Sequence, residues 1–158
     1  MNKLVLIFSI LLLSALAQSA DAQTSQVQNT LHDFTSDGCS WSPDGTVVLQ
    51  KTEFVPCCVE HDVAYWAGGT HEQQQAADQR LKQCVKEKSN GFFANLYYGG
   101  VRMGGNAFLP TPFHWGYGWE KRRGYKPLSE EQQKMVQEKY SHVNWVQIYT
   151  SLGIELVK

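Results

Sequence analysis

The sequence predicts a mainly α-helical domain built on an antiparallel pair of helices held by disulfides. Helix-start and helix-end signals bound residues 56–67 and 70–88, with Pro56 in the first turn and Gly68 and Gly69 at the first helix end. Helices joined by so short a connection pack as antiparallel neighbours. All four cysteines lie between Cys39 and Cys84, and an even number of cysteines in an exported chain predicts disulfides.

The N-terminus has the pattern of a signal peptide over residues 1–22. Lys3 gives a positive start, residues 4–13 are almost entirely apolar, and Ala-x-Ala cleavage sites end at Ala17 and Ala22. An uncleaved anchor is the alternative, but the apolar run is short for a transmembrane span. We therefore expect export, either to a periplasm or to the outside medium.

The remaining residues, 23–158, are the right length for a single domain with one core. The formal net charge is −1, and removal of residues 1–22 leaves it unchanged because Lys3 and Asp21 cancel. A chain so balanced has no overall electrostatic reason to bind nucleic acid or an anionic membrane. Nothing in the sequence indicates an oligomeric state.

Two elements are expected before the helix pair. Apolar residues at helical spacing predict a short amphipathic helix over residues 24–34. Residues 37–45 are rich in Gly, Ser, Pro and Asp, which predicts a turn-forming loop. Such a loop can direct several backbone carbonyls at one hard cation such as Ca²⁺. An ordinary turn with no ligand is the alternative.

The first helix of the pair carries the residues with the most chemistry. Helical spacing places Cys57, His61 and Tyr65 on one stripe, with Cys58 and Asp62 on the next. This favours a general base beside a metal-binding carboxylate, on a helix that disulfides hold rigid. An exposed polar face on such a helix is the alternative.

The second helix brings a further carboxylate toward the first. Thr70 and Gln73 form a capping box, and the helix is expected to run to about Lys88. Asp78 lies on the same side as the apolar positions Ala77, Leu81, Cys84 and Val85. A carboxylate directed at the core needs a partner, and His61 and Tyr65 are the candidates.

The four cysteines allow three disulfide pairings, and their positions alone do not choose between them. A zinc site formed by cysteines and His61 is the competing interpretation. Adjacent Cys57 and Cys58 point in different directions on a helix, which disfavours a shared metal.

The C-terminal part combines an aromatic, Gly-rich segment with helices. A short helix is expected over residues 92–98, followed by a flexible Gly-rich loop over residues 99–105. Ser129 and Gln132 form a second capping box, which predicts a polar helix to about residue 142. The residues from Trp145 onward fit either a helix or a strand.

Residues 110–125 hold many aromatics next to a basic run, Lys121 to Arg123. One interpretation is a peripheral membrane contact through Trp115, Tyr117 and Trp119, with rings at the lipid–water boundary and cations on phosphates. The alternative, which we favour, is a lid packed over the core.

Three pieces of the sequence together resemble the secreted phospholipase A2 superfamily. The pattern Cys57-Cys58-x-x-His61-Asp62-x-x-Tyr65 resembles its active-site helix, and residues 36–44 are similar to the calcium loop of its bacterial and fungal branch. Residues 77–84 resemble the helix that brings the partner aspartate. The matched core spans residues 37–85, whereas residues 92–158 match nothing in the pattern.

This resemblance implies a phospholipase A2-like fold with a calcium-binding loop. It implies the disulfides Cys39–Cys58 and Cys57–Cys84. It also implies a Ca²⁺ ion held by the Asp62 carboxylate and by carbonyl oxygens near Asp37 and Gly38.

The implied reaction is calcium-dependent hydrolysis of the sn-2 ester of a glycerophospholipid. His61 would be the general base that activates water, Asp78 would fix the imidazole, and Tyr65 would hold Asp78. The chain has no Gly-x-Ser-x-Gly motif, which argues against a serine esterase. The alternative function is a non-catalytic phospholipase A2-like module that binds a lipid or a protein.

Overall fold

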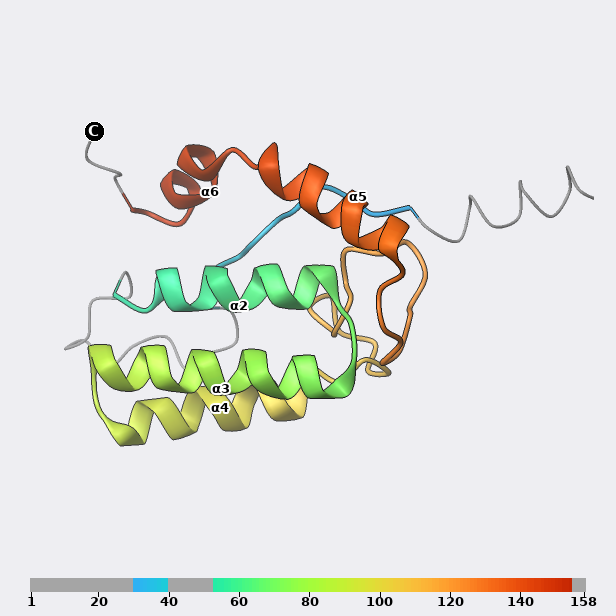
Figure 1. Ribbon diagram of the computed structural model, residues 1–158. Helices are drawn as coiled ribbons and strands as arrows, with labels where there is room; N and C mark the ends of the chain where they lie inside the picture. Colours follow the sequence, from blue (N-terminus) through green and yellow to red (C-terminus); the bar gives the residue numbers. More distant parts are fainter. Residues whose placement is uncertain (1–29, 40–52, 155–158) are drawn as a thin grey trace, which may run out of the picture. The chain divides into compact units, whose positions relative to one another are not determined.

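Helices make up most of the computed structural model, which describes residues 30–39 and 53–154 (Figure 1). The five described helices are α2 (Val55–Ala67), α3 (His71–Lys88), α4 (Gly91–Gly104), α5 (Glu130–Ser141) and α6 (Trp145–Ser151). All belong to one compact unit that begins at Leu31. The mainly α-helical prediction is confirmed. The expected signal peptide (1–22) and most of the expected loop (37–45) lie outside the described residues.

Residues 31–37 do not form the last turns of the helix that the sequence predicted over residues 24–34. They run in extended form, and Leu31 makes an isolated antiparallel bridge with Trp119. Leu31 and Phe34 are still buried, because their side chains pack against Trp66 and the other members of the core. The apolar spacing here therefore marks core contacts rather than a helix.

Helices α2 and α3 form the predicted antiparallel pair (Figure 1). Pro56 lies in the first turn of α2, where its missing N–H is not needed. The capping box at the start of α3 is present, since the Gln73 amide N–H donates to Thr70 Oγ1 (3.3 Å) and the Thr70 N–H to Gln73 Oε1 (2.8 Å).

Two disulfides tie the start of α2 to its neighbours. Cys39 pairs with Cys58 and Cys57 with Cys84, with Cα–Cα distances of 5.2 and 5.7 Å. This is the pairing that the resemblance implied, and it leaves no free cysteine. The zinc interpretation is therefore wrong, because the thiolates that it needs are joined to each other.

Helix α4 is longer than the sequence predicted. It begins at Gly91, where the Asn90 side chain accepts hydrogen bonds from the Phe92 and Phe93 N–H groups, and continues to Gly104. The expected Gly-rich loop over residues 99–105 is thus mostly helical. Glycine inside a helix costs about 1 kcal/mol relative to alanine. Val101 packs on the core and Arg102 is paired, and these contacts offset that cost.

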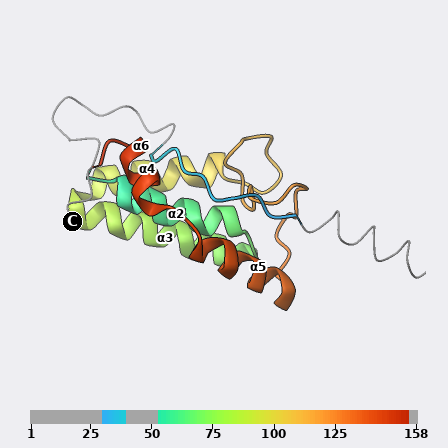
Figure 2. The ribbon, with the colours of Figure 1, turned by 90° about the horizontal axis from the view of Figure 1, so that it is seen from above.

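The last two helices cover the other side of α2 (Figure 2). The Ser129 capping box begins α5 as predicted, and the segment from Trp145 is a helix rather than a strand. Apolar side chains of both helices pack on the cluster that contains Val59 and Trp66; they are Met135, Val136, Trp145, Ile148 and Tyr149.

The aromatic, Gly-rich segment satisfies the backbone carbonyls at the end of α2. The last four carbonyls of a helix have no partner within it. Here the Gly116 N–H donates to the Tyr65 carbonyl (2.7 Å), and the Gly118 N–H donates to that of Trp66 (3.2 Å). Trp119 Nε1 donates to the Ala67 carbonyl (2.8 Å). The remaining carbonyl accepts from the Gly68 N–H, so all four are bonded.

The tryptophans of this segment, which one interpretation of the sequence placed at a membrane, are buried in the structure. Trp115 is 1% exposed and Trp119 is 3% exposed, and their indole N–H groups bind the Gly69 and Ala67 carbonyls. The predicted membrane contact through Trp115 and Trp119 does not fit this burial, and Tyr117 is half-buried with its hydroxyl on the Thr35 carbonyl. Among the described helices, none has the length and hydropathy needed to cross a membrane.

We expect Gly118→Ala to lower the free energy of unfolding by roughly 1–3 kcal/mol. A Cβ at this position would lie 2.3 Å from Trp66 Cδ1 and 2.7 Å from the Trp66 carbonyl oxygen. Chemical denaturation measures the change. Gly100→Ala is the matched control, because a Cβ there meets nothing within 4 Å. It should raise stability by about 0.5–1 kcal/mol, and equal effects in both variants would contradict the close packing at Gly118.

Candidate active site

The structure brings His61 of α2 and Asp78 of α3 into direct contact. His61 Nε2 lies 2.9 Å from Asp78 Oδ1, and the Tyr65 hydroxyl donates to the same oxygen at 2.8 Å. Helical spacing puts His61 and Tyr65 one turn apart, so one carboxylate oxygen can reach both. Asp78 has no exposed surface and His61 is 8% exposed. The three side chains that the sequence grouped together therefore form one buried network.

A fourth residue, Arg102 of α4, completes the network. Arg102 Nη1 donates to Asp78 Oδ2 at 2.9 Å, so each oxygen of the carboxylate is hydrogen-bonded. A buried carboxylate is tolerated when charged and hydrogen-bonded partners replace the water that it loses. The bond to Asp78 raises the pKa of Arg102, and burial, followed by the Asp78 charge, raises the pKa of Tyr65.

The Tyr65 ring is held on both sides. It meets the Trp115 ring edge-to-face with centroids 5.0 Å apart, and the Gly105 backbone approaches it closely. A Cβ on Gly105 would lie 2.4 Å from Tyr65 Cε1. Buried Gln74 secures that approach by donating from Nε2 to the Gly105 carbonyl (2.8 Å). These neighbours restrict the Tyr65 ring, whose hydroxyl is hydrogen-bonded to Asp78.

The second imidazole nitrogen of His61, Nδ1, takes no part in the contact with Asp78. It has no hydrogen bond to any residue that the structure describes. His61 also lines a cavity of about 10 Å³ with Cys57, Ala77 and Leu81, among others. That volume is about enough for one water molecule. One nitrogen is thus held by a carboxylate, while no described residue is hydrogen-bonded to the other.

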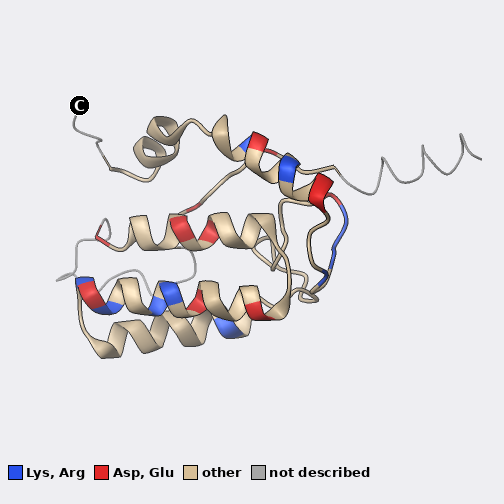
Figure 3. Cartoon of the chain, viewed as in Figure 1, with Lys and Arg blue, Asp and Glu red and all other residues tan. Residues whose placement is uncertain are grey.

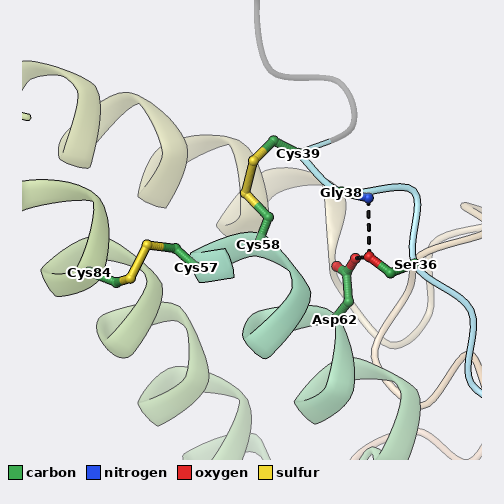
Figure 4. Close-up of a disulfide and its surroundings, with 7 residues drawn as sticks. All are labelled: Ser36, Gly38, Cys39, Cys57, Cys58, Asp62 and Cys84. Atoms are coloured by element: carbon green, nitrogen blue, oxygen red, sulfur yellow. Dashed lines mark hydrogen bonds between the residues drawn. A yellow bond between two sulfur atoms is a disulfide. The ribbon is translucent and has the colours of Figure 1, made fainter. Parts of the chain in front are cut away.

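Asp62 points toward the segment that precedes Cys39 (Figure 4). The Ser36 hydroxyl donates to Asp62 Oδ2 at 2.5 Å, and the Gly38 N–H donates to Ser36 Oγ at 3.1 Å. The Cys39–Cys58 disulfide holds this segment beside α2. Gly38 is thereby linked to Asp62 through Ser36, which is the neighbourhood that the resemblance implied.

The Asp62 carboxylate lies in an environment that favours a cation. Burial raises its pKa to about 8, against the lowering effect of the Ser36 hydrogen bond, and the nearby charge of Asp37 raises it further. A carboxylate is a ligand that Ca²⁺ prefers, and the Ser36 hydroxyl oxygen lies beside it. Among residues 30–39 and 53–154, no three His, Cys, Asp or Glu side chains converge on one point. Asp62 and Ser36 could therefore supply only part of the oxygen ligands that a calcium ion needs.

Arg102 and Ser36 are the two site residues whose roles the sequence reasoning missed. Arg102 is the only Lys, Arg, Asp or Glu between Ser89 and Trp119, and such an isolated charge is a signal that it pairs with a buried acid. Its segment was expected to be a loop, which hid its place on a helix beside α3. The bond from Ser36 to Asp62 spans 26 positions, and no local pattern indicates it.

Comparisons of the chain with protein-family models, curated proteins and solved structures find no significant match. What the chain does is therefore inferred from its own residues and their geometry.

We expect Arg102→Gln to lower the free energy of unfolding by roughly 1–3 kcal/mol, because Asp78 Oδ2 would lose its charged partner while staying buried. Denaturant titration at neutral pH measures this change. Arg122→Gln is the matched control, since Arg122 is exposed and its hydrogen bond goes to the Phe108 carbonyl (3.1 Å), and it should change stability by less than about 0.5 kcal/mol. An Arg102 effect no larger than the control would mean that Asp78 does not depend on the ion pair.

The raised pKa of Asp62 predicts a pH-dependent stability in the metal-free protein. Between its ordinary value of 3.8 and about 8, the folded state keeps a proton that the unfolded state releases, so stability falls as pH rises through this range. Asp62→Asn lacks that titration. Its stability relative to wild type should therefore increase between about pH 5 and about pH 8, measured by thermal denaturation with chelator.

Asp33→Asn is the control for this measurement. Asp33 is exposed, and its hydrogen bond to Lys139 lowers its pKa, so this variant should show no relative gain as pH rises. A constant difference between wild type and Asp62→Asn across the range would show that Asp62 is not desolvated.

Proposed function

We propose that the chain is a calcium-dependent hydrolase of the phospholipase A2 type, which cleaves the sn-2 ester of glycerophospholipids with a water molecule activated by His61 and Asp78. The observation that carries this proposal is the buried contact between His61 Nε2 and Asp78 Oδ1, while no described residue is hydrogen-bonded to His61 Nδ1. A histidine held in this way is suited to act as a general base that takes a proton from water.

In this reaction His61 takes a proton from water at Nδ1 as the water oxygen attacks the ester carbonyl carbon. The imidazolium that forms donates from Nε2 to Asp78, whose negative charge stabilises it. Tyr65 and Arg102 keep the carboxylate in place through their own hydrogen bonds. The proton then passes from His61 to the leaving alkoxide of the glycerol backbone.

The Asp62 carboxylate, with oxygens of residues Asp37 and Gly38, would hold the calcium ion. When bound, Ca²⁺ supplies polarisation of the ester carbonyl and neutralisation of the lipid phosphate. The desolvated Asp62 and the hydrogen-bonded segment from Ser36 to Gly38 support this assignment. Asp62→Asn should accordingly abolish calcium binding, measured by titration calorimetry, while the circular dichroism spectrum stays unchanged.

The fold and location belong to the same proposal. A phospholipase A2-like core over residues 37–85, with a calcium loop before α2, accounts for why two disulfides meet at the start of that helix. Both disulfides are typical of proteins from oxidising compartments. They support export, with residues 1–22 as the signal peptide.

A non-catalytic module of the same type is the second candidate. One observation favours it, because His61 is 8% exposed and the cavity that it lines is about 10 Å³, far smaller than a phospholipid. Binding a lipid or a protein requires no access to that nitrogen. The complete set of His61, Asp78 and Tyr65 favours catalysis, since a binding module has no need of a buried base.

Fatty-acid release from mixed micelles of phosphatidylcholine and phosphatidylglycerol tests the proposal. We expect release that requires calcium, stops with excess chelator, and falls at least about 100-fold in His61→Gln, because the general base is lost. His142→Gln is the matched control, since His142 is exposed at the end of α5, and it should keep full activity.

Near-normal release by His61→Gln would contradict the mechanism. Absence of release by the wild-type protein, with calcium binding retained, would favour the non-catalytic module.

A further inference from the structure

The outer face of α4 is an apolar stripe that no described part of the chain covers. Phe92 is 71% exposed, Leu96 40% and Met103 76%, and they lie at positions i, i+4 and i+11 of the helix. This spacing aligns them with Gly99 on one side of the helix, opposite the fully buried Ala94. We call Phe92, Leu96, Gly99 and Met103 the α4 stripe. Exposed apolar groups in such a row mark an interaction surface.

The α4 stripe itself is uncharged, and cations lie beside it. Figure 3 shows hardly any charge on α4, whereas charged residues follow the neighbouring α3. Lys82 of α3 places its ammonium 5.0 Å from the centre of the Tyr98 ring, and Lys86 follows one turn later on the same side. Gln79 also contacts Tyr98, which fixes this side of α3 as the one beside α4.

The charge of this region is opposite in sign to that of the chain. Residues 79–104 hold five Lys or Arg side chains and one acidic side chain, Glu87, while the whole chain has a net charge of −1. Anionic headgroups attract such cations, and apolar side chains next to them enter the acyl boundary. A second copy of the chain would offer the same cations, so its approach to this face would place like charges together.

We propose that the α4 stripe, with Lys82 and Lys86 at its edge, docks the protein on an anionic phospholipid surface. The choice of phospholipid rests on the proposed function, in which phospholipid is the substrate. Arg102 of the same helix pairs with Asp78, so α4 is bonded to the candidate site on one face and carries the docking surface on the other. Docking on this face requires neither Trp115 nor Trp119, both of which are buried.

Vesicle co-sedimentation with excess chelator tests docking separately from hydrolysis. Wild-type protein should bind phosphatidylglycerol vesicles more tightly than phosphatidylcholine vesicles. The double variant Phe92→Ser, Met103→Ser should bind at least about tenfold more weakly, and so should Lys82→Gln, Lys86→Gln. Val146→Ser, at a residue 62% exposed on α6, and Lys121→Gln, Lys126→Gln, at exposed lysines outside α3 and α4, are the controls that should bind normally.

Hydrolysis of short-chain phosphatidylcholine below its micelle concentration separates this proposal from the proposed function. Both double variants, Phe92→Ser, Met103→Ser and Lys82→Gln, Lys86→Gln, should keep wild-type activity on the monomeric lipid, since their substitutions lie outside the site. A wild-type protein that binds vesicles through α4 but hydrolyses nothing would overturn the function and leave the docking surface standing.

Three results would overturn the docking surface. The first is failure of the wild type to bind phosphatidylglycerol vesicles. The second is equal binding by the two double variants, Phe92→Ser, Met103→Ser and Lys82→Gln, Lys86→Gln, and by the controls. The third is a dimer in sedimentation equilibrium that the substitutions Phe92→Ser, Met103→Ser dissociate. The last result would assign the α4 stripe to a second copy of the chain.

Discussion

The buried carboxylate of Asp78 is the constraint on which the helical core depends. A desolvated charge must be paired, and its partners come from both neighbouring helices, with His61 and Tyr65 on α2 and Arg102 on α4. These bonds tie α2, α3 and α4 to one another at Asp78. The same constraint creates the candidate site, since a carboxylate that organises the core also fixes one nitrogen of a histidine.

Helix α2 is fixed at both ends by parts of the chain that lie far from it in sequence. At its start, two disulfides join it to Cys39 and Cys84. At its end, backbone and indole groups of residues 116–119 satisfy its last carbonyls. A helix held in this way presents adjacent side chains to different surroundings, so His61 faces α3 while Asp62 faces the segment from Ser36 to Gly38. A candidate base and a candidate cation ligand are thus adjacent in sequence but have different hydrogen-bond partners.

Helix α4 connects the site to the surface. On its inner face, Arg102 forms an ion pair with Asp78. Its outer face carries Phe92 and Met103 beside the lysines of α3. In the proposed function, a protein must approach an aggregated lipid as well as activate water. The outer face of α4 would meet the lipid, and its inner face would support the residues that activate water.

The helix pair, its capping box, and the candidate residues His61, Asp78 and Tyr65 could be predicted from local patterns, because these features depend on spacing within or between adjacent helices. Other features depend on tertiary contacts. They are the helical conformation of residues 99–104, the extended path of residues 31–37 and the burial of Trp115 and Trp119. Each depends on partners far away in the chain. Arg102 is helical because Asp78 needs a cation, and the tryptophans are buried because α2 has carbonyls to satisfy. Local patterns identify apolar and aromatic residues, but only the folded chain shows which carbonyl and carboxylate groups lie within hydrogen-bond distance of them and of Arg102.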